Sequence, residues 1–204
     1  LESIVARVAL VLDASGSMNQ RFKKGDVQTV VDRIFPLAAH FDDNGELDVW
    51  TFAETCLALS PVSGANLKGY IDREKGGWKL WRLGARQNFE PDAIRAVIDA
   101  FRTSKLPTYV LFISDGGVRS SREIERLIVE ASNLPIFWQF VGLGGDNYGI
   151  LERLDSMSGR VVDNCNFFAL DDIQSVSEQE LYERLLGEFP QWLQEARTKK
   201  IIPS

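Results

Sequence analysis

The sequence predicts an α/β fold, a doubly wound, mostly parallel β-sheet with helices on both faces. Strand-like apolar runs alternate with helical patterns along nearly the whole chain, which is typical of βαβ units. Some of these runs, such as Ile4 to Leu12, are apolar almost without interruption, as strands buried on both faces are. No shift of composition divides the 204 residues, so we expect a single domain over residues 1–204.

Hydrophobic period and turn signals place the individual elements. The expected strands are 4–12, 47–53, 56–59, 108–114, 136–143 and 161–166. The expected helices are 27–41, 67–73, 90–101, 121–132, 149–157 and 174–186, with a further turn or two in 189–197. In sheets of this kind, ligands bind beyond the carboxyl ends of the strands, near the point where strand order reverses.

The first predicted strand ends in a short loop rich in side-chain oxygens. Asp13, Ser15 and Ser17 offer one carboxylate and two hydroxyls within one tight turn, which Gly16 allows to fold back. Hard oxygen ligands suit Mg²⁺, Ca²⁺ or Mn²⁺ rather than zinc. One carboxylate is too little for tight binding, so we expect a second loop to contribute.

The strand 108–114 supplies that second loop, because it ends in Asp115, Gly116 and Gly117. An isolated Asp-Gly pair is common in turns and alone would indicate only a turn or a cap. Its position after a buried strand, in a chain that also carries the first loop, favours a metal ligand. The carboxyl ends of two strands would then converge on one crevice.

Further oxygen ligands for the metal are expected from the loop 84–91, which leads into the helix 90–101. Gln87, Asn88 and Glu90 offer side-chain oxygens in this loop. The alternative is a loop that only caps the helix, with Asn88 as N-cap and Pro91 in the first turn. The sequence leaves both interpretations open.

Charge and composition exclude several classes of function. The net charge of −6 argues against a general binder of nucleic-acid backbones, and no run of about 18 apolar residues predicts a membrane span. The Lys- and Arg-rich spots at 68–79 and 82–86 are interpreted as solvated loops. Trp78 and Trp81 either pack over the sheet edge or form a partner-binding surface. Two distant cysteines favour buried thiols in a reducing compartment.

These motifs carry a family resemblance. The segment DASGS at 13–17 resembles the Asp-x-Ser-x-Ser motif of von Willebrand factor A domains, and SDGG at 114–117 resembles their second Asp motif. The stretch 136–173 is similar to the A domains of bacterial tellurium-resistance proteins of the TerF type, and copine A domains are more distant. The resemblance implies the Rossmann-like A-domain fold. Such domains often follow another module, and the chain starts at Leu1, so we expect the C-terminal part of a longer protein.

The resemblance also implies roles for particular residues. Ser15 and Ser17 would bind the metal directly, Asp13 mainly through water, and Asp115 directly or through water. The family usually has a Thr in the middle loop, and Gln87 occupies that slot here, because the Asn-aromatic pair that often follows matches residues 88–89. Gln87 could donate its amide oxygen, or Arg86 could bring a positive charge that weakens binding. We expect Asn88 and Arg86 to contact a partner.

The function implied is a non-enzymatic, cytoplasmic, metal-dependent protein-binding module of a tellurium-resistance or stress-response protein. A partner protein would supply a carboxylate to the divalent cation, with Mg²⁺ expected first and Ca²⁺ or Mn²⁺ as alternatives. One rival is a metal-dependent phosphohydrolase, although Ser15 stands where an aspartyl-phosphate enzyme needs a second Asp. Another is a scaffold whose metal site is degenerate, which the missing Thr motivates.

Overall fold

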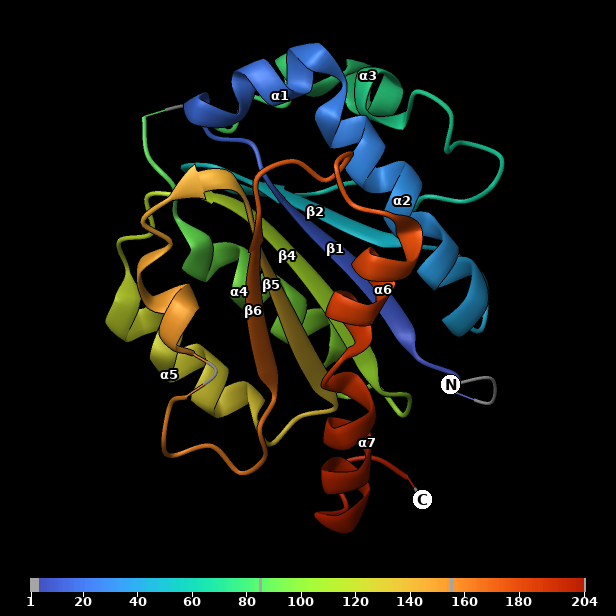
Figure 1. Cartoon of the computed structure of the whole chain (residues 1–204), viewed down its shortest axis with the longest axis vertical. Helices are drawn as coiled ribbons and strands as arrows, with labels where there is room; N and C mark the ends of the chain where they lie inside the picture. The colour runs from blue at the N-terminus through green and yellow to red at the C-terminus, as the bar shows by residue number, and fades with distance from the viewer. Residues whose placement is uncertain (1–3, 85, 155, 204) are drawn as a thin grey trace.

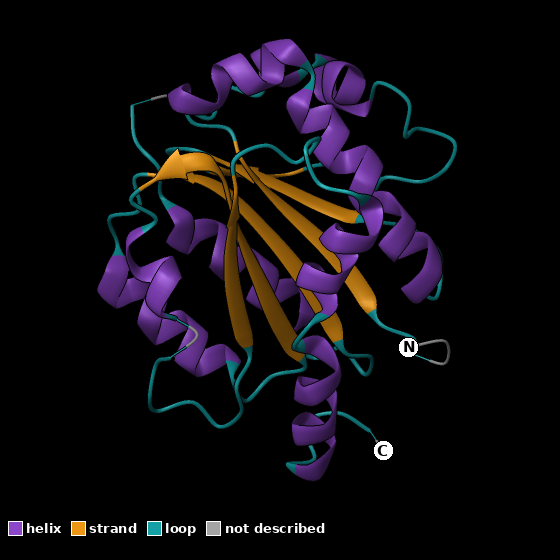
Figure 2. Ribbon diagram, viewed as in Figure 1, coloured by secondary structure: helices purple, strands orange, loops and turns teal. Residues whose placement is uncertain are grey.

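Six strands form one sheet in the computed structural model, which describes residues 4–84, 86–154 and 156–203 (Figures 1 and 2). The strands are β1 Arg7–Asp13, β2 Asp48–Phe52, β3 Cys56–Ala58, β4 Thr108–Gly116, β5 Ile136–Asp146 and β6 Cys165–Leu170. They lie in the order β3-β2-β1-β4-β5-β6. All neighbours pair in parallel except β2 and β3, which are antiparallel. The predicted doubly wound sheet is confirmed.

Helices cover both faces of this sheet. They are α1 Asn19–Lys24, α2 Asp26–Phe41, α3 Tyr70–Arg73, α4 Glu90–Phe101, α5 Ser121–Ala131, α6 Glu178–Leu186 and α7 Phe189–Thr198. Successive side chains of a strand point to opposite faces of the sheet, so the residues of β1 contribute to two apolar clusters, one on each face. Val8, Leu10 and Leu12 belong to the cluster with α2, α6 and α7, while Ala9 and Val11 belong to the cluster with α4 and α5. No helix in the described ranges is both long and apolar enough to cross a membrane.

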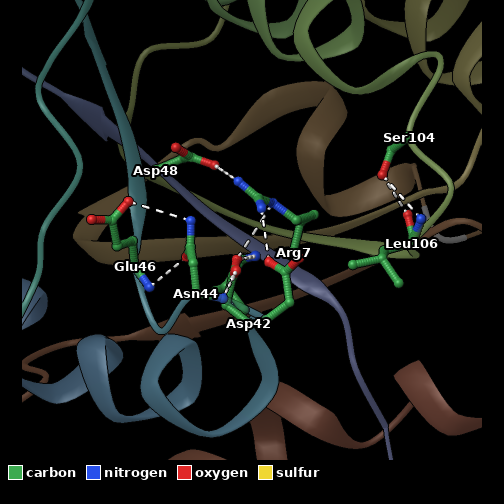
Figure 3. A network of polar contacts seen from close by, with 9 residues as sticks. Arg7, Asp42, Asn44, Glu46, Asp48, Ser104 and Leu106 are labelled. Atoms are coloured by element: carbon green, nitrogen blue, oxygen red, sulfur yellow. Dashed lines mark hydrogen bonds and ion pairs between the residues drawn. The ribbon is translucent and has the colours of Figure 1, made fainter.

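The amino-terminal end of β1 is held by a charged cluster (Figure 3). The guanidinium of Arg7 lies 3.6 Å from a carboxylate oxygen of Asp42, 2.9 Å from Asp43 and 3.4 Å from Asp48. The carboxylate of Asp42, which is buried, also accepts a hydrogen bond of 3.1 Å from the backbone N–H of Val8. These contacts fix β1 to the end of α2 and the start of β2.

Several predicted boundaries were wrong. The last strand was expected at 161–166 but runs over 165–170, because its pairing with β5 begins at Cys165. The helix expected at 149–157 is a 3-10 helix over 149–153, and Asp155 lies outside the described residues. The helical tail expected at 189–197 is confirmed as the ten-residue helix α7, which docks on the sheet, where the rings of Trp192 and Phe137 lie 5.7 Å apart.

Candidate metal-binding site

The site lies where the order of the strands reverses. β1 pairs with β2 on one side and with β4 on the other, so the connections that leave the carboxyl ends of β1 and β4 diverge. A crevice is expected at such a point in a doubly wound sheet. Asp13 is the last residue of β1, and Asp115 is the penultimate residue of β4.

Asp13 is completely buried and is surrounded by hydrogen-bond donors. One carboxylate oxygen accepts from the backbone N–H of Ser15 at 2.8 Å. The other accepts from the amide of Asn88 at 2.8 Å and from the hydroxyl of Ser114 at 3.3 Å. Burial raises the pKa of Asp13 to about 6, the nearby charge of Asp115 adds to the rise, and the hydrogen bonds oppose it. Within the described ranges no Lys, Arg or His side chain pairs with this carboxylate.

Three more oxygens connect the two strand ends. The hydroxyls of Ser15 and Ser17 lie 3.1 Å apart, and the hydroxyl of Ser17 donates to Asp115 at 3.0 Å. The structure therefore brings Asp13, Ser15, Ser17 and Asp115 together, as the sequence predicted. Two carboxylates and two hydroxyls fit a hard divalent cation. In the described part of the chain, no group of three or more His, Cys, Asp or Glu side chains is arranged to hold a metal ion. The donors at this site are carboxylates and hydroxyls, which do not favour a softer metal.

The loop before α4 was expected to bring Gln87 to the metal, but a different residue of this loop contacts Asp13. Asn88, rather than Gln87, reaches Asp13, and its amide also donates to the carbonyl oxygen of Gly116 at 3.1 Å. Gln87 is exposed and lies on the wall of the crevice. Asn88 is not the N-cap of α4, since that position belongs to Phe89. Ala85, in the same loop, lies outside the described residues.

Two glycines allow the ends of β4 and β5 to approach each other closely. Gly116 has φ of 110°, and a Cβ atom there would lie 2.2 Å from the carbonyl oxygen of Asp146. A Cβ atom on Gly145 would lie 1.8 Å from the carbonyl oxygen of Asp115. Both distances are too short for any side chain, so glycine at these positions brings the end of β5 to the metal site.

An open cavity of about 280 Å³ lies above the oxygens. Ser17, Asn88 and Asp115 line it, together with Arg86 and Arg119 from two loops and Asp146 at the end of β5. Ser114, Arg119 and Asp146 were not predicted as site residues from the sequence. The run LGGDN at 143–147 could have indicated Asp146, because it follows the carboxyl end of a third parallel strand.

Glu90 is a second buried acid beside the site. The residue is completely buried, and neither carboxyl oxygen makes a hydrogen bond of normal geometry within the described structure. Burial raises its pKa to about 7, the charge of Asp13 adds to this rise, and Asn88 opposes it. The side chain is not on the cavity wall, so its oxygens are not available there as ligands in this conformation.

Comparison with known proteins agrees with this geometry. Residues 5–202 match the family described as the von Willebrand factor A domain found in the TerF C-terminus. The uncharacterized protein YcbR of Bacillus subtilis is 44% identical over 206 residues, which cover 99% of this chain and 83% of YcbR. Protein BONZAI 2 of Arabidopsis thaliana is 37% identical over 118 residues, or 52% of this chain and 20% of that protein.

A solved structure with the same fold holds a metal. Proximal thread matrix protein 1 from the mussel byssus, with a zinc-occupied MIDAS motif, superposes with a TM-score of 0.53 at 18% identity. The match covers 96% of this chain and 49% of that one. The family match over residues 5–202 agrees with the strand order and with the oxygen-rich ends of β1 and β4. The chain belongs to the family of von Willebrand factor A domains that are found at the C-terminus of TerF.

Proposed function

We propose that this domain is a non-enzymatic, metal-dependent protein-binding module. Asp13, Ser15, Ser17 and Asp115 hold a divalent cation, and a carboxylate from a partner protein completes its coordination. The observation that carries the proposal is the buried carboxylate of Asp13, which has hydrogen-bond donors around it but, among the residues that the structure describes, no paired cationic side chain. A cation between the ends of β1 and β4 would supply the missing positive charge.

The donor set explains why a partner would be recruited. Two carboxylates and two hydroxyls leave coordination positions open on Mg²⁺, which prefers six oxygen ligands. The cavity above the site gives access, and Arg86 and Arg119 on its rim are both exposed. An incoming carboxylate would meet the metal below it and two guanidinium groups beside it. Rim charges of this kind favour an acidic partner.

The family supports the wider setting that we propose. Its description names TerF. This supports our proposal that the domain belongs to a cytoplasmic tellurium-resistance or stress-response protein. The zinc-occupied motif of the mussel protein supports a divalent cation at the corresponding place. The oxygen donors of this chain favour Mg²⁺, with Ca²⁺ or Mn²⁺ as alternatives.

A thermal-shift experiment with the metal alone tests the site. We expect Mg²⁺ at 10 to 100 times its dissociation constant to stabilise the domain by about 1.4–2.7 kcal/mol, which is about 3–10 °C. Ser15→Ala and Asp115→Asn should abolish the shift. Asp99→Asn is the matched control, because Asp99 is exposed on α4, and it should leave the shift unchanged.

Two results would contradict the proposal. The first is a melting temperature that does not respond to Mg²⁺, Ca²⁺ or Mn²⁺, which would favour a scaffold with a degenerate site. The second is hydrolysis of p-nitrophenyl phosphate in the presence of Mn²⁺ that disappears in the Asp13→Ala variant. That outcome would identify a metal-dependent phosphohydrolase instead.

A further inference from the structure

A basic surface lies beside the metal site in an otherwise acidic protein. We use the name "basic surface" for Lys23, Lys24, Lys75, Lys79 and Arg82, which are all exposed. Segments 19–24 and 68–84 together contain eight Lys or Arg residues and two Asp or Glu residues. The rest of the chain contains 15 Lys or Arg residues and 27 Asp or Glu residues. The positive charge is therefore concentrated in two segments that are far apart in sequence.

Aromatic packing joins these two segments. The ring of Phe22 on α1 stacks on Trp78 with centroids 4.9 Å apart, and meets the edge of Trp81 at 5.9 Å. Trp81 is buried, and its indole N–H donates to the carbonyl oxygen of Glu74 at 2.9 Å. Trp78 stays half-buried, and the ammonium of Lys79 lies 5.7 Å from the centre of its ring. The two tryptophans thus pack, and they join the two cation-rich segments, with Lys79 and Arg82 on one groove.

The carboxyl end of β1 connects this surface to the metal site. A groove of about 180 Å³ is lined by Ala14, Trp78, Lys79 and Arg82 among others. Ala14 lies between Asp13 and Ser15, so one side of the groove is the metal-binding loop itself. Figure 1 shows α1 and α3 together, beyond the end of the sheet toward which β1 runs. An extended segment bound at the metal could therefore continue over Trp78.

The cations of the basic surface are not neutralised by the protein. Among the described residues, no carboxylate forms an ion pair with Lys75, Lys79 or Arg82. Trp78, which is half-buried, adds an aromatic side chain to the groove beside Lys79 and Arg82. A surface that combines unpaired cations with an aromatic ring fits a chain that carries carboxylates and at least one apolar side chain.

We infer that the basic surface binds an acidic segment of the partner protein, which continues from the carboxylate at the metal along the groove over Trp78. This inference rests on the proposed function. The metal would hold one carboxylate, and Lys79 and Arg82 would select a segment with further Asp or Glu residues next to it. The domain is negatively charged overall and would repel an acidic segment elsewhere on its surface. The segment would therefore leave the metal in the direction of Lys79 and Arg82.

A labelled peptide tests the inference with the 204-residue chain. The probe is a fluorescein-labelled peptide of alternating Glu and Asp around a central Phe, and its Gln and Asn counterpart is the uncharged control. Binding is followed by fluorescence anisotropy in Mg²⁺ at low ionic strength, where surface charges are little screened. We expect the acidic probe to bind and the uncharged probe not to bind.

Charge-reversed variants locate the binding. Lys79→Glu with Arg82→Glu should weaken the acidic probe about tenfold, while the Mg²⁺-dependent thermal shift stays as in the wild type. Lys105→Glu with Lys199→Glu is the matched control, because both lysines are exposed outside the basic surface, and it should lower the affinity much less.

Each other outcome has a distinct meaning. The inference is overturned if the wild type does not bind the acidic probe, or if binding needs Mg²⁺ but is unaffected by the Lys79 and Arg82 changes. In the second case the proposed function stands. Tighter binding of a labelled single-stranded oligodeoxythymidylate, lost in the same variant, would also overturn it in favour of a nucleic acid. Peptide binding that survives EDTA and Asp115→Asn but needs Lys79 and Arg82 supports the acidic partner and contradicts the proposed metal-dependent function.

Discussion

Each end of β1 has a buried aspartate beside it, but only one of them faces a cation. At the amino-terminal end, Asp42 lies against the guanidinium of Arg7. At the carboxyl end, Asp13 is surrounded by hydroxyl, amide and backbone N–H donors alone. Burial raises the pKa of both carboxyl groups to about 6. At both ends burial disfavours the ionised carboxylate, and the two ends differ in the groups that oppose this effect, which are Arg7 and backbone N–H groups at Asp42 and hydrogen bonds at Asp13.

This difference distinguishes a structural cluster from the proposed metal site. A buried carboxylate is tolerated when a partner charge and hydrogen bonds compensate for its lost hydration. Arg7 is part of β1, so the compensation at the amino-terminal end forms whenever the strand folds. At the other end the hydrogen bonds are present, but no cationic side chain among the described residues pairs with Asp13. The proposed divalent cation would supply that positive charge.

The largest effect is expected from Arg7→Ala. The change leaves Asp42 buried beside two other carboxylates, and we expect a loss of about 2–3 kcal/mol at pH 7.5, below the range for fully buried pairs because Arg7 is about a quarter exposed. Chemical denaturation measures it. Arg102→Ala removes a surface arginine that contacts Asp99 and Glu130, and this control should cost less than about 1 kcal/mol.

The defect of Arg7→Ala should depend on pH. Arg7 lowers the pKa of Asp42, which burial has raised to about 6, so its removal raises that pKa further. A carboxyl group whose pKa is higher in the folded state than in the unfolded state stabilises the fold as pH falls. The defect should be greatest above pH 7 and should shrink toward pH 5. A defect of the same size at pH 5 and pH 7.5 would show that lost packing, not charge, is responsible.

The second-largest effect is expected at the other end of the strand, from Asp13→Asn. The variant should lose the Mg²⁺ stabilisation of about 1.4–2.7 kcal/mol. In EDTA at neutral pH it should melt at or above the temperature of the wild type, because burial disfavours the ionised carboxylate that the change removes. Thermal melts with and without Mg²⁺ measure both effects. A variant that is strongly destabilised in EDTA would mean that Asp13 is structural, as Asp42 is.

The sequence predicted the sheet well because its strands are apolar on both faces. The run at Ile4 to Leu12 favours a buried strand, and the alternation of strands and helices then restricts the topology to a mostly parallel sheet. It missed α1, whose sequence NQRFKK places only Phe22 in the core. It also began β6 too early, because Val161 has the propensity of a strand residue but is 47% exposed and outside the pairing.

In the candidate site, too, the features set by local sequence were predicted, and those that depend on long-range contacts were not. Asp13, Ser15 and Ser17 lie in one turn, so their spacing alone places them together. The direction of each side chain in the loop before α4 depends on how that loop crosses the ends of β1 and β4, which no local pattern encodes. The basic surface was interpreted as solvated loops because the contact between Phe22 and Trp78 joins segments more than 50 residues apart.

The smallest effect tests the middle loop, where the sequence favoured Gln87 and the structure brings Asn88 to Asp13. Asn88→Ala removes the amide that holds one oxygen of Asp13 and the carbonyl of Gly116, and residues that orient ligands typically matter tenfold or more for metal affinity. We expect about a tenfold weaker Mg²⁺ affinity, or about 1.4 kcal/mol, by calorimetric titration. Gln87→Ala removes an exposed side chain from the same loop and should change the affinity less than about twofold. If Gln87→Ala had the larger effect, Gln87 would take the place of the missing Thr as a ligand, and the loop would have to rearrange when the metal binds.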